Sequence, residues 1–274
     1  MPPSARLSTE RVSPASGALR VTWLQCLAPY RWAAPLAAAT TVLDAGCGEG
    51  YGTAELARQA RLAVGLDRDA AVLAAARARY PGPPSAWVSG EAEALPFATG
   101  TFDLVCCFQV LEHLPDPAHF LGEARRVLAP GGRLLLTTPN HAAVLPGLNP
   151  HHAREYDPAT LHALLSPHFP EVRLLGVFGS ERVLAYRARN RRLVERLLTL
   201  DHWRLRQRLP RPLLERLHAW GTLAVRSWLH RRAPGLARSI GPEDFWVGQG
   251  NLDQALDLVA VCRLPEAIDR HPPS

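Results

Sequence analysis

Hydrophobic and polar positions follow two alternating patterns between residues 41 and 178. Short strand-like runs occupy residues 41–44, 62–66, 85–89, 101–108, 133–138 and 172–178. The longest of them are continuously apolar, which is typical of strands buried on both faces of a sheet. The intervening segments 51–60, 70–80 and 117–128 predict helices, because they are rich in Ala, Leu and Arg and are bounded by glycine or proline. This alternation predicts a doubly wound α/β fold, a parallel sheet with helices on both faces.

The segment 186–232 differs from the rest of the chain in composition. It contains 13 arginines and many leucines. An apolar stripe at steps of three and four residues predicts at least one amphipathic helix; it is formed by Leu213, Leu217, Trp220, Ala224 and Trp228. We expect a helical insertion packed against the sheet. The alternative is a lid, or a peripheral membrane surface for a lipid-linked or anionic substrate. Residues 256–263 then predict a last strand that returns to the sheet.

Length and composition limit the class of protein. The chain has 274 residues, of which 47% are hydrophobic and 20% charged. These values fit a medium α/β domain with an insertion and exclude global disorder. No window of 18 uncharged apolar residues occurs, so we expect no membrane-spanning helix. The first residues are polar and proline-rich, which predicts no secretory signal.

Charge and cysteine content add two expectations. The net charge is +6, but all 31 basic residues are arginine and lysine is absent. This usage is typical of a GC-rich genome and argues against a dedicated nucleic-acid partner. The 5 cysteines are odd in number and lack a C-x-x-C pair, so we expect neither disulfides nor a zinc site but a reduced, cytoplasmic compartment. The oligomeric state is left open.

A glycine-rich loop follows the first predicted strand. It reads Asp44-x-Gly46-x-Gly48-x-Gly50 and precedes a helix, an arrangement that exposes bare backbone to a ligand. The spacing is not that of the dinucleotide fingerprint, and the Walker lysine is missing. Asp44 disfavours a pyrophosphate and suits an ammonium group, while Asp67, at the end of the second strand, can accept hydrogen bonds from ribose hydroxyls. A nucleoside that carries an amino acid fits both carboxylates, and S-adenosylmethionine (SAM) is such a molecule.

Further motifs follow the loop in a characteristic order: VGLD at 64–67, GEAEALPF at 90–97, FDLV at 102–105, VLEHLPD at 110–116 and GGRLLLTTPN at 131–140. Together they resemble the class I SAM-dependent methyltransferases. The resemblance implies a Rossmann-like, seven-stranded, mainly parallel sheet with a helical insertion before the last strand. It divides the chain into an N-terminal helical cap (1–38), a SAM-binding core (39–180), the Arg/Leu-rich insertion (181–250), and the last strand with a tail (251–274).

The resemblance implies cofactor contacts at the ends of the first four strands, namely Asp44, Gly46, Gly48, Gly50, Asp67, Arg68, Glu91, Ala92 and Gln109. The glycine loop and Gln109 would line the methionine part of SAM. Asp67 would hold the ribose, with Arg68 stacking beside the adenine. Glu91 and Ala92 would meet the adenine edge, although the family more often has Asp at the position of Glu91.

The acceptor is expected at loops 109–117 and 139–157, because ligands of open α/β sheets bind beyond the carboxyl ends of the strands. In one hypothesis His152 is a general base and Arg154 holds an anionic or hydroxylated substrate. In the other, Glu112, His113 and His152 bind a divalent cation, as in small-RNA 2′-O-methyltransferases and some ubiquinone O-methyltransferases. Those enzymes have Glu where this chain has Gln109. We therefore predict His152, His113 and Arg154 as catalytic residues and no metal; a purely structural hydrogen bond from His113 is the alternative for that residue.

Residues 150–157 resemble a bacterial branch of these methyltransferases that is linked with polysaccharide synthesis. Residues 9–12 and 30–33 of the cap resemble the same branch. Gln25 departs from that branch, which often has a histidine nearby. The resemblance implies methyl transfer to an oxygen of a small-molecule or glycan-type acceptor. The alternatives are a quinone or aromatic-metabolite methyltransferase, an RNA 2′-O-methyltransferase, or a catalytically silent module that keeps the fold. The Asn/Asp-Pro-Pro-aromatic motif of DNA N-methyltransferases is missing after the fourth strand.

Overall fold

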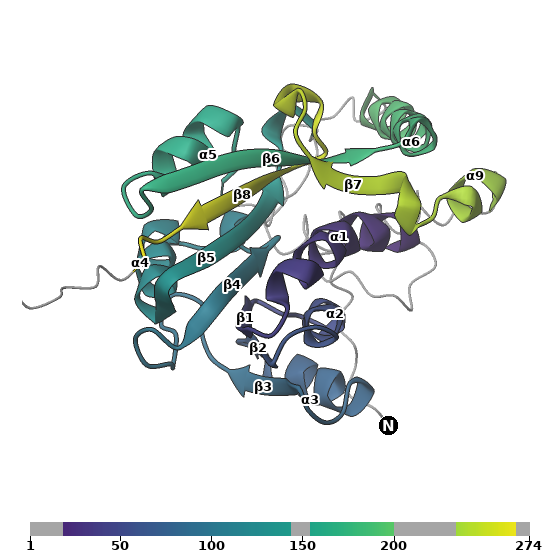
Figure 1. Ribbon diagram of the computed structural model, residues 1–274. Helices are drawn as coiled ribbons and strands as arrows, with labels where there is room; N and C mark the ends of the chain where they lie inside the picture. Colours follow the sequence, from purple (N-terminus) through teal and green to yellow (C-terminus); the bar gives the residue numbers. More distant parts are fainter. Residues whose placement is uncertain (1–18, 144–153, 200–233, 267–274) are drawn as a thin grey trace, which may run out of the picture.

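The computed structural model describes residues 19–143, 154–199 and 234–266 and contains an eight-stranded sheet (Figure 1). The strands are β1 (Thr41–Ala45), β2 (Leu62–Asp67), β3 (Ser85–Ser89), β4 (Phe102–Phe108), β5 (Leu128–Pro139), β6 (Glu171–Gly179), β7 (Phe245–Gly248) and β8 (Asp257–Arg263). Their order across the sheet is β3-β2-β1-β4-β5-β8-β6-β7. The first five run parallel, whereas β8 is antiparallel to both β5 and β6, and β7 is antiparallel to β6. The predicted Rossmann-like fold is confirmed.

Three details differ from the prediction. The sheet has eight strands, because the four residues of β7 add an edge strand from within the predicted insertion. Strand β5 begins at Leu128, five residues before the predicted strand, since the chain stays extended through Pro130 and shifts its register against β4. The first core helix ends at Ala57 rather than at residue 60.

Helices cover both faces of the sheet (Figure 1). The α-helices are α1 (Arg20–Ala33), α2 (Tyr51–Ala57), α3 (Ala70–Arg79), α4 (Pro117–Val127), α5 (Pro158–Leu165), α6 (Glu181–Thr199) and α9 (Pro234–Ser239). Helices α4 and α5 pack on one face; α1 and α2 pack on the other, where α6 and α9 join α1 near β6. Short 3-10 turns are η2 (Ala34–Ala37), η3 (Leu111–His113), η4 (His141–Ala143), η5 (Pro242–Asp244) and η6 (Leu252–Gln254).

Local sequence explains where several helices begin. Asp69, Asp116 and Asp157 each accept a hydrogen bond from a backbone N–H in the first turn of the helix that follows. These aspartates satisfy donors that a helix N-terminus leaves without a partner. Proline stands in the first turn of α4 and α5, where its fixed φ suits the helix and no backbone donor is lost.

The two faces of the sheet form separate hydrophobic cores. Cys106 lies in the core beneath α1 and α2, with Leu56 and Tyr30. Its neighbour Cys107 lies in the opposite core, with Phe120 of α4. Successive residues of a strand point to opposite faces, which is why the two adjacent thiols lie in different cores. All five cysteines are free.

Among the helices that the structure describes, none is both long and apolar enough to cross a membrane. The predicted apolar stripe at 213–228 and the cap motif at 9–12 lie outside the described residues. The same holds for His152.

Candidate active site

The glycine-rich loop between β1 and α2 is held against the end of β2. The backbone N–H groups of Gly46 and Cys47 both donate to the carbonyl oxygen of Leu66, at 2.7 and 2.9 Å. Gly46 has φ +81°, and a Cβ there would lie 2.4 Å from a methyl carbon of Val110. Gly48 has φ +51°, but a Cβ there would meet nothing within 4 Å. Gly46 is therefore required by packing, whereas the backbone at Gly48 faces open space that a ligand can enter.

Asp67 lies beside this open space. Its Oδ2 accepts a hydrogen bond from the Gly48 N–H at 3.0 Å, and its Oδ1 accepts one from Asp69 N–H at 2.9 Å. A carboxylate can accept about four hydrogen bonds, so these two contacts orient the group and leave capacity for ligand hydroxyls. The N–H of Gly90 donates to the Asp67 carbonyl at 3.1 Å, which brings the end of β3 to the same place.

The loop that carries the predicted adenine contacts follows Gly90. Glu91 and, beyond β2, Arg68 are exposed, whereas Ala92 is buried. Because β1, β2 and β3 pair in parallel, their carboxyl ends lie side by side. The residues predicted to contact the methionine, ribose and adenine parts of SAM therefore lie at the same end of the sheet.

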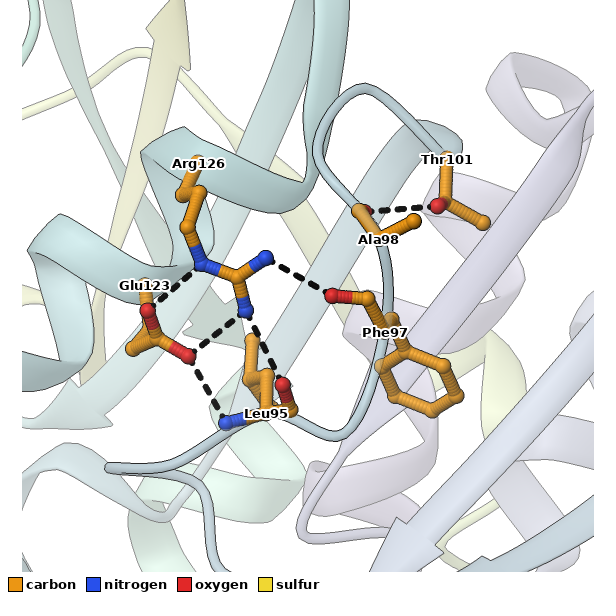
Figure 2. A network of polar contacts seen from close by, with 6 residues as sticks. All are labelled: Leu95, Phe97, Ala98, Thr101, Glu123 and Arg126. Carbon is orange, nitrogen blue, oxygen red and sulfur yellow. Dashed lines mark hydrogen bonds and ion pairs between the residues drawn. The ribbon is translucent and has the colours of Figure 1, made fainter.

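Helix α4 fixes the far end of the same loop (Figure 2). Arg126 donates from Nη1 to the Phe97 carbonyl at 2.7 Å and from Nη2 to the Leu95 carbonyl at 2.9 Å. Glu123 accepts from Leu95 N–H at 2.9 Å and pairs with the same guanidinium at 2.7 Å. Three backbone groups of the loop are thus bound by two side chains of one helix.

Asp44 is buried below the glycine loop. Its Oδ1 accepts from the Tyr30 hydroxyl at 3.0 Å, and its Oδ2 accepts from Thr53 Oγ1 at 2.6 Å. Burial raises the pKa of Asp44 to about 6, although both hydrogen bonds oppose the rise. The carboxylate thus ties α1 and α2 to β1. No sequence signal singled out Thr53, and Tyr30 stood out only as part of the cap motif at 30–33.

Gln109 stands at the end of β4 with φ +59°, a left-handed conformation for a residue other than glycine. Its side-chain amide donates to Thr137 Oγ1 at 3.3 Å, and the Gln109 side chain opposes the rise in the pKa of Asp257. Asp257 is the first residue of β8, and it pairs with Pro139 because β8 runs antiparallel to β5. Burial raises the pKa of Asp257, while Gln25 and the Arg187 charge oppose the rise.

Two of the residues weighed for the acceptor site lie just beyond β4. Glu112 is buried, accepts from Thr138 Oγ1 at 3.1 Å, and has a pKa that burial raises to about 8. Its Oε1 lies 4.0 Å from His113 Nε2. Arg154 is exposed, two residues before the buried Tyr156. His152, which both hypotheses require, is not among the described residues; within those ranges no three His, Cys, Asp or Glu side chains form a metal-binding group.

Comparison with known proteins decides the family. A family model described as "Methyltransferase domain" matches residues 43–136. A probable S-adenosylmethionine-dependent methyltransferase of Mycolicibacterium smegmatis is 41% identical over 183 residues, covering 65% of this chain and 70% of that protein. The chain belongs to the SAM-dependent methyltransferases of class I.

Two further matches differ in how much of each chain they cover. A ubiquinone biosynthesis O-methyltransferase of Pseudomonas paraeruginosa is 36% identical over 128 residues, and the match covers 44% of this chain and 51% of that protein. A solved SAM-dependent methyltransferase of Thermotoga maritima superposes with a TM-score of 0.58 and 15% identity, over 89% of this chain and 91% of that one. At this identity the structural match supports the fold alone.

The cofactor of this methyltransferase is therefore SAM, and the residues present fit it. The open space at Gly48 admits a ligand to bare backbone, and Asp67 presents a carboxylate beside it. SAM supplies a methyl group bound to a positively charged sulfur. The contacts of Asp67 with the ribose and of Gln109 with the methionine part of SAM stay predictions. Both residues lie at the carboxyl ends of parallel strands.

Proposed function

We propose that this methyltransferase transfers the methyl group to a hydroxyl oxygen of a small-molecule or glycan-type acceptor. The observation that carries the proposal is His113, a partly exposed imidazole just beyond the end of β4 whose Nε2 lies 4.0 Å from Oε1 of Glu112. A hydroxyl must lose its proton as its oxygen attacks carbon, and such a proton needs an acceptor nearby.

The residues of the chain have three tasks in this proposal: they bind the acceptor, exclude water and take the hydroxyl proton. His152 takes the proton as general base, and Arg154 orients an anionic or hydroxylated acceptor. His113, next to Glu112, is a second group able to accept a proton at this edge. The bond that forms joins the acceptor oxygen to the methyl carbon, and the carbon–sulfur bond breaks with its electron pair left on sulfur.

A methyltransferase of quinones or aromatic metabolites is the second candidate. It is supported by the partial similarity to ubiquinone biosynthesis O-methyltransferases, which covers the core but less than half of this chain. Both candidates transfer methyl to oxygen, so they differ in the acceptor rather than in the chemistry.

The test is methyl transfer from tritiated SAM to a fractionated cell extract, with the full chain as enzyme. We expect label in the polar saccharide or small-molecule fractions; label confined to the apolar aromatic fraction would favour the quinone candidate. His152→Ala should lower turnover without changing SAM affinity in calorimetry. His162→Ala, an exposed histidine on α5, is the matched control. Failure to label any fraction by a sample that binds SAM would contradict the proposal.

A further inference from the structure

A series of polar contacts leads from the cofactor site to helix α6. The Gln109 side chain opposes the rise in the pKa of Asp257, and Gln25 of α1 donates from Nε2 to Asp257 Oδ2 at 2.8 Å. Arg187 of α6 donates from Nη1 to Gln25 Oε1 at 3.1 Å. Two side chains thus separate Arg187 from Gln109. Because Asp257 pairs with Pro139 at the carboxyl end of β5, where the acceptor is expected, we expect α6 to border the space that the acceptor uses.

The guanidinium of Arg187 is held by neutral groups. Its hydrogen-bond acceptors among the described residues are Gln25 Oε1 and, at 3.2 Å, the carbonyl oxygen of Ala143. Burial lowers the pKa of Arg187, and the charge of Asp257 partly opposes this. A guanidinium has five N–H donors in a fixed fork that matches a carboxylate or phosphate. A poorly hydrated cation of this kind favours an anionic ligand.

Two polar side-chain atoms, one on α6 and one on α1, are buried and have no hydrogen-bond partner in the described part of the chain. Asn190 lies three residues after Arg187, on the same side of α6, and its Oδ1 is buried without a hydrogen-bond donor. On α1, Nε1 of Trp23 is buried without an acceptor. Unsatisfied buried groups are rare in folded proteins. Asn190 is thus an unpartnered polar group that shares a side of α6 with Arg187.

We infer that Arg187 binds a carboxylate or phosphate group of the acceptor, with Asn190 on the same side of α6 as a second polar contact. The inference rests on the proposed function, because it assigns the class of acceptor at the same site: an anionic, hydroxyl-bearing molecule such as an acidic or phosphorylated sugar. Arg187 and Asn190 lie outside residues 43–136, which match the general methyltransferase domain. Residues that select the acceptor are expected outside the segment that serves the shared cofactor.

The test measures binding of three sugars to the full chain in the presence of S-adenosylhomocysteine, by calorimetry. The probes are glucose 6-phosphate, glucuronate and neutral glucose. We expect the two anionic sugars to bind at least about tenfold more tightly than glucose, as loss of a charged hydrogen bond predicts. Arg187→Gln should abolish that preference, whereas Arg187→Lys, which keeps the charge, should retain part of it. Arg189→Gln, an exposed arginine on α6, should behave like the parent.

Equal affinity for the three sugars, no binding of any of them, or an unchanged preference in Arg187→Gln would overturn the inference. Vesicles of phosphatidylinositol, compared with phosphatidylcholine, distinguish a lipid-borne anion from a soluble one. S-adenosylhomocysteine affinity, measured for each variant, confirms that the cofactor site is intact. The methyl-transfer assay distinguishes failure of the inference from failure of the proposed function. A preference for anionic sugars without methyl transfer to oxygen would reject the proposed function alone. Methyl transfer to a neutral acceptor would reject the inference alone.

Discussion

The substitution Glu112→Gln tests the most strongly perturbed carboxyl group beside the predicted methyl site. Burial raises the pKa of Glu112 from 4.5 to about 8. Between these pH values the folded chain keeps a proton that the unfolded chain has released. The folded state therefore binds more protons, and the free energy of unfolding falls as pH rises from about 4.5 to about 8.

The size of the effect follows from the same pKa values. At roughly 1.4 kcal/mol for each tenfold change in proton affinity, the charging of Glu112 destabilises the fold by on the order of 5 kcal/mol. Charging of Asp44 also lowers the free energy of unfolding as pH rises. Its pKa is raised only to about 6, so most of this loss is complete below neutral pH. Comparing the variant with the parent isolates Glu112, because Asp44 and Asp257 are present in both proteins.

The measurement is urea unfolding at pH 5, 6, 7, 8 and 9, followed by circular dichroism. We expect similar stability at pH 5, because a protonated Glu and a Gln are both neutral and nearly equal in size. At pH 8 and 9 the variant should be the more stable protein, with most of the difference appearing above pH 6. The exposed Glu171→Gln is the control and should follow the parent. Parallel stability curves for Glu112→Gln and the parent would refute the reasoning.

Three further substitutions address the cofactor site. Asp67→Ala should weaken SAM binding by about tenfold or more, because hydrogen bonds to a charged group contribute roughly 1.5–3 kcal/mol; unchanged affinity in calorimetry would remove its ribose role. Gly48→Ala should weaken SAM binding and cost about 1–2 kcal/mol of stability at its positive φ; full SAM affinity would mean that no ligand uses that space. Arg126→Gln should release the Leu95 and Phe97 carbonyls, lowering stability by roughly 1–2 kcal/mol and raising the KM for SAM. If the KM stays constant, the contact serves the fold alone.

Much of the core follows from local pattern alone. The apolar runs at β1, β2 and β4 are continuous because these strands are covered on both faces, and that continuity is visible in the sequence. The glycine loop and Asp67 were found for a similar reason. Both stand where a strand ends, and the carboxyl ends of parallel strands meet at one edge of the sheet.

The limits of local pattern appear at β5 and β7. The pair Gly131-Gly132 indicates a turn, and Gly131 does have φ +74°, but the chain pairs with β4 on both sides of it, with Leu128 opposite Phe102 and Arg133 opposite Leu104. The four residues of β7 are too short to stand out from an Arg/Leu-rich segment, and their pairing with β6 makes them a strand. Tertiary pairing overrides weak local preference in both cases.

The sequence alone determined the fold class and the family, and it predicted where the cofactor binds, because these depend on periodicity and on motifs of neighbouring residues. Only the tertiary structure brought Gln25, Arg187 and Asp257 together, across separations of 232 and 162 positions in the chain. Asp257 begins an apolar strand and carries no local signal of a role. It reaches the site because β8 enters the sheet antiparallel between β5 and β6, which places its first residue at the edge where the parallel strands end.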